Sequence, residues 1–383
     1  MRVMTIFGTR PEIIRLSVII KQLDKFCEHI VVHTGQNYDE NLSDIFFREL
    51  NLRLPDVHLG IKATNFADQL GQILIRTSEV IDRLKPDRLL ILGDTNSGLS
   101  SIVAARRGIP VFHLEAGNRC YDDRVPEEIN RRIIDHCSAV LMPYTHRAKE
   151  NLLREGIERD RIFVVGNPIY EVINSYEDRI HNSRILHNFK LEPQKYFVVT
   201  MHRAENVDNP VRLARLLEGL SLIGERYQLP IIVSLHPHTA DKIQSFGLSN
   251  QSEYIKFYTP LGFFDFIALE RNALCVITDS GTVQEECCIL RIPSVTIRDV
   301  TERPETIECG SNMLTGVQPQ RIVNAVEVVL GSSKDWRHPT EYMEQKVSTT
   351  VTKIVLGYHH FRRVGVEASN LNLSSQVEEG RHE

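Results

Sequence analysis

The sequence predicts a doubly wound α/β fold with two domains. Short apolar runs rich in β-branched residues alternate with longer amphipathic segments across nearly the whole chain. Several of the apolar runs lack a two-residue alternation, which is typical of parallel strands buried on both faces. At 383 residues, the chain is also longer than one hydrophobic core usually serves.

The repeated order of strand, helix and strand places the elements. Strands are predicted at residues 3–7, 30–33, 88–92, 111–114, 162–165, 197–200, 231–235, 274–278 and 294–297. Helical spacing is clear at 13–24, 211–227 and 320–329. Such an alternation predicts parallel sheets covered by helices on both faces.

A domain boundary is expected near residue 170. Gly166-Asn167-Pro168 closes one strand-like run, and a polar stretch over 176–194 precedes the next strand. We therefore expect an N-terminal domain over 1–170 and a C-terminal domain over 171–346. Residues 364–383 lose periodicity and predict a disordered tail. Ligands of such sheets bind at the carboxyl ends of the strands, so a cleft between the domains is the expected site.

Composition excludes several classes of protein. Hydrophobic residues make up 42% and charged residues 25% of the chain, as in ordinary globular proteins. The formal net charge of −5 leaves no basic surplus for a general nucleic-acid binder. No apolar stretch is long enough to span a membrane. The seven cysteines are scattered without a C-x-x-C pair, which favours a reducing, cytoplasmic location.

An anion site is expected after the first strand. Thr9 and Glu12 have the spacing of a capping box, and Arg10 and Arg15 lie in the first turns of the predicted helix. The N-terminus of a helix attracts anions, although a capped helix with surface arginines would give the same pattern. No G-x-G-x-x-G motif follows the strand, which disfavours a nicotinamide or flavin enzyme.

Carboxylates follow the next strands of this half. Asp94 comes after the run at 88–92 and could cap the following helix. Glu115 ends a buried strand, and capping alone does not explain it. Glu127 begins an amphipathic helix, where an acid also suits the helix dipole.

Histidines follow the strands of the second half. His202 comes after the run at 197–200, with Arg203 beside it, and His236 and His238 come after 231–235. A lone histidine at such a position is more often structural than catalytic. A zinc site built from His202, His236 and His238 is an alternative, but the three lack helical ligand spacing.

The strand at 274–278 ends in the clearest phosphate-binding pattern. Ser280 and Gly281 open a helix, and Thr282 with Glu285 again has capping-box spacing. Backbone N–H groups there would take a diphosphate, and a carboxylate one turn into the helix could hold ribose hydroxyls. Anion-binding turns in both halves predict a small anionic ligand between the domains.

These motifs occur in a recognisable order. They are Gly8-Thr9-Arg10-Pro11-Glu12, Gly93-Asp94-Thr95, His113-Leu114-Glu115-Ala116-Gly117, Pro126-Glu127-Glu128-Ile129-Asn130-Arg131, His202-Arg203, Asp279-Ser280-Gly281 and Thr301-Glu302-Arg303-Pro304-Glu305. Together they closely resemble the non-hydrolysing UDP-N-acetylglucosamine 2-epimerase family over residues 1–363. Gly117-Asn118-Arg119-Cys120 is nearer a subgroup that acts on UDP-6-deoxy-L-sugars of the N-acetyl-talosamine and fucosamine kind.

The resemblance implies a fold and a reaction. The fold is two Rossmann-like domains facing across a cleft, as in GT-B glycosyltransferases, with a C-terminal helix over 347–363 that returns to the first domain. The reaction removes the C2 proton and eliminates UDP to give a 2-acetamidoglucal, and UDP then adds back with the proton on the other face. Neither a metal nor a redox cofactor is implied, and a homodimer in polysaccharide biosynthesis is expected.

The resemblance also implies roles for individual residues. The implied acid/base residues are Asp94, Glu115, Glu127 and His202. The implied UDP-sugar ligands are Arg10, Arg15, His236, Phe266, Ser280, Gly281, Thr282, Glu286 and Arg303, with Phe266 near the uracil. A C2 proton is weakly acidic, so the chemistry requires a base with a raised pKa. Burial or a nearby like charge would raise it.

The chain departs from the family at three places. Many members carry Gln-His-Arg where this chain has Gln36-Asn37-Tyr38, so allosteric activation by UDP-GlcNAc is unsupported here. Lys is commoner at the position of Arg15, and Leu261 replaces a Gln near the uracil. A GT-B glycosyltransferase, a hydrolysing 2-epimerase and a non-catalytic nucleotide-sugar sensor are the competing hypotheses.

Overall fold

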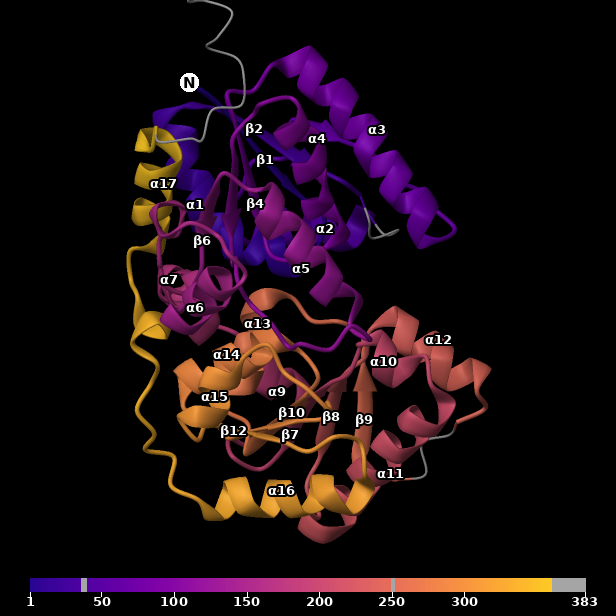
Figure 1. Ribbon diagram of the computed structural model, residues 1–383. Coiled ribbons are helices and arrows are strands. Elements are labelled where there is room, and N and C mark those ends of the chain that lie inside the picture. The colour runs from indigo at the N-terminus through magenta and orange to yellow at the C-terminus, as the bar shows by residue number, and fades with distance from the viewer. Residues whose placement is uncertain (36–39, 249–251, 360–383) are drawn as a thin grey trace, which may run out of the picture.

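The computed structural model describes residues 1–35, 40–248 and 252–359 and contains two parallel six-stranded sheets (Figure 1). The first sheet has the order β3-β2-β1-β4-β5-β6, and the second has the order β12-β11-β10-β7-β8-β9. Both follow the doubly wound order, in which the chain reverses between β1 and β4 and again between β7 and β10. The predicted fold class is confirmed.

The strands are short, as in most α/β domains. Their bounds are β1 Arg2–Phe7, β2 Glu28–His33, β3 Val57–His58, β4 Arg88–Leu92, β5 Val111–Leu114, β6 Val140–Met142, β7 Phe197–Thr200, β8 Ile231–Ser234, β9 Ile255–Tyr258, β10 Cys275–Thr278, β11 Ser294–Thr296 and β12 Asn312–Leu314.

Helices connect almost every pair of strands. In the N-terminal half they are α1 Arg10–Phe26, α2 Glu40–Glu49, α3 Phe66–Leu84, α4 Ser101–Arg106, α5 Pro126–Cys137, α6 His146–Arg154 and α7 Pro168–Ser175, with 3₁₀ turns η1 Asn96–Ser100 and η2 Arg159–Arg161. In the C-terminal half they are α8 Glu177–His181, α9 Ile185–Phe189, α10 Ala204–Val207, α11 Pro210–Tyr227, α12 Pro237–Ser245, α13 Phe263–Arg271, α14 Gly281–Leu290, α15 Pro304–Glu308, α16 Pro319–Gly331, η3 Thr340–Met343 and α17 Val347–Gly357.

One hydrophobic cluster runs through both halves of the molecule. It includes Val3 and Phe7 of the first sheet and Val198 and Val276 of the second, with helices α1, α7, α13, α14 and α17 between them. The outer face of each sheet has a separate cluster, under α3 in the first half and under α11 and α16 in the second. Because the two sheets share packed side chains, burial of this apolar area stabilises their association.

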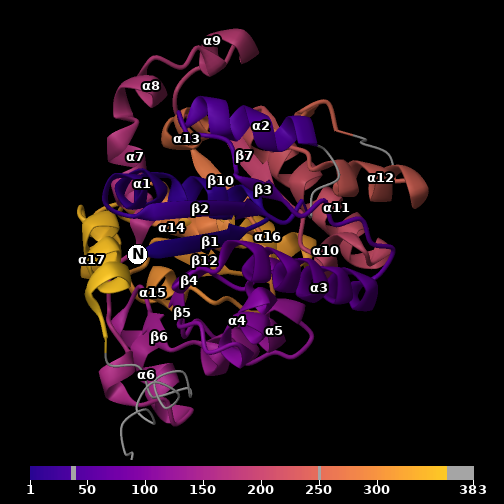
Figure 2. The same cartoon turned by 90° about the horizontal axis from the view of Figure 1, so that it is seen from above.

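The end of the described chain lies beside its beginning. Helix α17, yellow in Figure 1, packs against α1 in both views (Figure 2). The guanidinium of Arg88 in β4 donates to the main-chain oxygen of Val355 in α17. The predicted domain boundaries stay a prediction, and the predicted tail at 364–383 lies outside the described residues.

The strands that the sequence did not predict are β3, β6, β9 and β12, and all four lie at sheet edges. Strands β3, β9 and β12 are short and partly exposed, so their apolar signal is weak, whereas β6 is buried but only three residues long. The strand predicted at 162–165 is wrong. Only an isolated bridge forms there, between Ile162 and Leu141, because the turn at Gly166 follows at once.

The start of α1 agrees with the sequence. Thr9 and Glu12 form the predicted capping box, and the Glu12 carboxylate accepts from Thr9 N at 2.8 Å. In the described part of the chain, every helix is too short or too polar to cross a membrane.

Gly117 allows a sharp prediction about stability. Its φ is +81°, and a Cβ there would lie 2.3 Å from the main-chain oxygen of Ala148. Gly117→Ala is therefore expected to lower the free energy of unfolding by about 3 kcal/mol, because it adds backbone strain to overpacking. Urea denaturation followed by circular dichroism measures the loss.

The matched control is Gly71→Ala in α3, where a Cβ would have no neighbour within 4 Å. There alanine is expected to stabilise the protein by up to about 1 kcal/mol, because it is the better helix former. Equal stabilities of the two variants would contradict the argument.

Candidate functional site

The predicted site residues lie where the carboxyl ends of the two sheets approach each other. Asp94 follows β4 and Glu115 follows β5, while His202 follows β7 and Ser280 follows β10. Ion pairs of Glu285 with Arg15, Glu127 with Arg203 and Glu115 with Arg303 join the two halves at this level. The candidate site is therefore built from the carboxyl ends of strands in both sheets, where ligands of doubly wound folds bind.

Four buried charges form the centre of the interface. Arg15 of α1 donates to Glu115 and to Glu285 of α14. Arg303 donates to Glu115 Oε1 at 2.5 Å and also pairs with Glu285. We call Arg15, Glu115, Glu285 and Arg303 the central ion cluster. Each side chain is nearly inaccessible, so each charge depends on its partners in the other half.

The central ion cluster controls the charge of Glu115. Burial alone would raise the pKa of this carboxyl, but the charges of Arg15 and Arg303 lower it to about 2. Glu115 is therefore ionised at neutral pH. Its backbone adopts φ +69°, a left-handed conformation that a non-glycine residue rarely takes outside functional sites. The expectation of a raised pKa is wrong for Glu115 in this arrangement.

Asp94 has the raised pKa that the chemistry requires. Burial raises the pKa of its carboxyl, and the charges of Glu115 and Glu127 add to the rise against the charge of Arg131. Arg131 Nε donates to Asp94 Oδ2 at 2.8 Å. The alternative prediction that Asp94 caps the following helix is wrong, because Thr95 is the N-cap of η1. About 20% of the Asp94 side chain remains exposed, so a ligand can reach it.

Glu127 connects the two halves at the edge of the site. It lies in the first turn of α5, and its Oε1 accepts from Arg203 NH1 at 2.7 Å. Burial would raise its pKa, but Arg203, Arg131 and a backbone hydrogen bond lower it overall. With 32% of its side chain exposed, Glu127 is an ionised and accessible carboxylate.

His202 is accessible and neutral. Asp279 accepts its backbone N–H at 3.0 Å, and 41% of the side chain is exposed. The surrounding protein lowers the pKa of the imidazole by desolvation, and the charges of Arg203 and Arg10 lower it further against Asp279. A neutral ring at neutral pH can accept a proton as well as pass one on.

His236 has a structural contact of its own. Its Nδ1 caps α12 by accepting the backbone N–H of His238 at 3.3 Å, and burial lowers its pKa to about 4. His238 instead binds Asp208 Oδ1 at 2.7 Å. The described residues hold no group of three or more His, Cys, Asp or Glu suited to a metal, and His236 and His238 make separate contacts.

The turn after β10 forms the predicted start of a helix. Ser280 is the N-cap of α14, and its Oγ lies 2.8 Å from Thr282 Oγ1. The capping box predicted for Thr282 and Glu285 is wrong, because α14 begins at Gly281, two residues earlier than that box requires, and Glu285 pairs with arginines. Gly281 is open enough that a Cβ would meet only Arg303, at 3.6 Å.

Other predicted ligands surround this turn. Glu286 is buried one turn into α14, and the guanidinium of Arg10 acts on its charge. Arg10 also lies over the Phe46 ring, 5.5 Å from its centroid. Phe266 is half-buried on α13. Arg15 and Arg303 are instead committed to the central ion cluster, so a bound diphosphate must compete with carboxylates for them.

Sequence reasoning gave no functional part to Arg131, Asp279 or Glu285. Arg131 binds Asp94, Asp279 holds the backbone of His202, and Glu285 closes the central ion cluster. Arg131 lies within a family motif, so the motif was the available signal. The pairing of Glu285 joins positions 270 residues apart, which no local pattern reveals.

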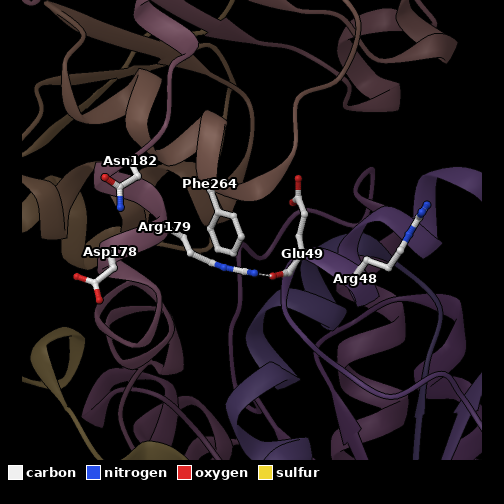
Figure 3. A pocket seen from close by; sticks show the side chains of 6 residues that line it. All are labelled: Arg48, Glu49, Asp178, Arg179, Asn182 and Phe264. Carbon is white, nitrogen blue, oxygen red and sulfur yellow. Dashed lines mark hydrogen bonds between the residues drawn. The ribbon is translucent and has the colours of Figure 1, made fainter.

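A separate pocket lies between α2, α8 and α13 (Figure 3). Its volume is about 520 Å³, and its lining residues are Arg48, Glu49, Asp178, Arg179, Asn182 and Phe264. The Glu49 carboxylate accepts the first backbone N–H of α13, from Phe263, at 3.0 Å. None of the predicted site residues lines this pocket. It therefore lies apart from the candidate site, although residues of both halves line it.

Comparison with known proteins agrees with the geometry. Residues 21–356 match the family described as UDP-N-acetylglucosamine 2-epimerase. The UDP-N-acetylglucosamine 2-epimerase of Methanocaldococcus jannaschii is 44% identical over 88% of this chain and 95% of its own. A Pseudomonas aeruginosa relative, UDP-2,3-diacetamido-2,3-dideoxy-D-glucuronate 2-epimerase, is 37% identical over 87% of this chain and 93% of its own.

A solved structure shows the same fold. It is the crystal structure of the M. jannaschii UDP-GlcNAc 2-epimerase in complex with UDP-GlcNAc and UDP, with a TM-score of 0.89 and 42% identity. The match covers 93% of this chain and 99% of that one. The chain therefore belongs to the UDP-N-acetylglucosamine 2-epimerase family and is an isomerase, as its ordered motifs predict.

Proposed function

We propose that this isomerase inverts C2 of a UDP-N-acetylhexosamine by elimination and re-addition of UDP. The C2 proton leaves to a protein base, the C1–O bond to UDP breaks, and a 2-acetamidoglucal forms. UDP then adds back at C1 while a proton reaches the opposite face of C2. The observation that supports this most is a set of accessible groups with opposed pKa shifts beside a helix N-terminus.

The proposed roles follow from exposure and charge. Asp94 fits the base, since its raised pKa makes the carboxylate a better proton acceptor. Inversion needs protons on both faces of C2, and Glu127 and His202 are the other accessible groups. Glu115 lies behind them and is proposed to act once the diphosphate draws Arg303 away, because its pKa then rises.

The helix N-terminus is proposed to hold the diphosphate. Gly281 and Thr282 present the first backbone N–H groups of α14, the Ser280 hydroxyl lies beside them, and a helix dipole favours an anion there. Arg10 and His236 border the same space, and Glu286 is proposed to bind the ribose. Phe266 is proposed to lie near the uracil.

The substrate is proposed to be UDP-GlcNAc or a close analogue. The M. jannaschii relative is solved with UDP-GlcNAc and UDP, and the P. aeruginosa relative is named for a diacetamido uronate. Since relatives differ at C3 and C6, the 6-deoxy-L-sugars of the subgroup motif are the second candidate. We also propose a cytoplasmic location, because all seven cysteines are free thiols suited to a reducing compartment. A homodimer is proposed on the family resemblance alone.

Incubation in D₂O tests the reaction itself. We expect UDP-GlcNAc to gain deuterium at C2 and to equilibrate with its C2 epimer, because removal and return of the proton exchange it with solvent. Proton NMR measures the exchange. Labelling of a UDP-6-deoxy-L-sugar alone would identify the subgroup substrate.

The same NMR sample distinguishes the competing functions. Free reducing sugar would indicate a hydrolysing epimerase, transfer to an acceptor without exchange a glycosyltransferase, and tight binding without turnover a sensor. Each of these outcomes contradicts the proposal.

Glu115→Gln is expected to separate chemistry from binding. Turnover should fall by about 100-fold or more, the range of acid–base catalysis. UDP affinity should be kept or rise, because the central ion cluster gains one net positive charge. Deuterium exchange and calorimetry measure the two effects, with the exposed Glu150→Gln as control. Weaker UDP binding with normal turnover would refute the role.

Arg10→Ala should show the reverse pattern. Loss of a charge-assisted contact is expected to raise KM by about 10-fold or more, while kcat changes less. Steady-state kinetics on UDP-GlcNAc checks this, with the exposed Arg106→Ala of α4 as control. A fall in kcat at unchanged KM would place Arg10 in the chemical step instead.

A further inference from the structure

The helix that contributes Glu286 faces a second buried acid. Glu270 of α13 is fully buried, and among the described residues neither of its carboxyl oxygens has an N–H or hydroxyl donor. A buried carboxylate without hydrogen-bond donors is energetically costly, so Glu270 is expected to be protonated and neutral.

The available partner is Glu286. Helix α13 packs against α14, and the carboxyls of Glu270 and Glu286 lie close enough to interact, so that burial together with this contact raises the pKa of Glu270 well above its usual range. Two ionised carboxylates could not pair there, since neither has a proton to donate. The pair therefore shares a proton at neutral pH, as coupled acids in a dry site do.

We propose that Glu270 is a positioning residue for the nucleotide ribose: it keeps a proton, donates it to one oxygen of Glu286, and leaves the other oxygen to accept from ribose hydroxyls. The inference rests on the proposed function, in which Glu286 binds ribose. It extends the nucleotide site to a residue that makes no contact with solvent.

The surroundings of the pair set its charge. The pKa of Glu286 is raised to about 7, mainly by burial and also by the charge of Glu285, against the charges of Arg15 and Arg10 and the contact with Glu270. Two other titratable groups lie near Glu270, Tyr196 beside β7 and Cys287 of α14. Both are uncharged at neutral pH, because burial raises their pKa.

Two substitutions at Glu270 separate positioning from packing. Glu270→Gln keeps an N–H donor to Glu286, whereas Glu270→Met keeps the volume and removes the donor. Calorimetry with UDP from pH 6 to pH 9 is the measurement. Ionisation of UDP itself is the same for all proteins and cancels when variants are compared at each pH.

We expect Glu270→Gln to match the wild type within about twofold. Glu270→Met should bind UDP about tenfold more weakly near pH 7.5, because Glu286 loses a charge-assisted donor. The carboxylate form of Glu286 binds ribose, so UDP affinity falls as pH drops through its pKa. Without its donor that pKa rises, and the fall should begin at higher pH in Glu270→Met alone.

Equal affinities and equal pH profiles for all three proteins would overturn the proposal. Melting curves check folding, and Glu270→Met is expected to remain folded because it replaces a buried acid by an apolar side chain of similar size. Equal losses in both variants would show packing alone and also overturn it.

Failure of the proposed function gives different results. Unchanged UDP affinity in Glu286→Gln would remove Glu286 from the nucleotide site, and absence of C2 exchange in the wild type would remove the reaction.

Discussion

The central ion cluster of Arg15, Glu115, Glu285 and Arg303 is the interaction on which the rest of the site depends. Its two cations and two anions come from both halves of the chain and balance to zero net charge inside a dry interface. Removing one member would leave an uncompensated buried charge, which is far costlier than the pair is worth. These ion pairs therefore fix how the two halves are aligned, and the shared hydrophobic cluster supplies buried apolar area between them.

Around this centre, the ionisable side chains differ in how exposed they are. The members of the central ion cluster are inaccessible, whereas Asp94, Glu127 and His202 keep part of their side chains open. Arginines decide the charge of each acid. Glu115 has two of them and a depressed pKa, while Asp94 shares one with Glu128 and Glu302 and keeps a raised pKa.

Much of the fold could be predicted because parallel strands buried on both faces leave long apolar runs. The central strands β1, β4, β7 and β10 were all predicted, and these position the site. Three of the edge strands were missed because partial exposure removes the apolar pattern, and the fourth, β6, because it has only three residues. Motifs placed Asp94, Glu115 and His202 correctly at strand ends, since the sequence order of a doubly wound sheet fixes that geometry.

Partners and charge states could not be predicted in the same way. Glu285 has the spacing of a capping residue, yet it pairs with Arg15 because α14 and α1 meet at the interface. The pKa of Glu115 depends on that distant contact, so burial alone gave the wrong sign. The formal charge of −5 shows the same limit: it describes the whole chain, while binding of a diphosphate depends on a few guanidinium groups. Those groups are held by neighbouring carboxylates until an anion competes for them, which restricts the site to small ligands that can enter the interface.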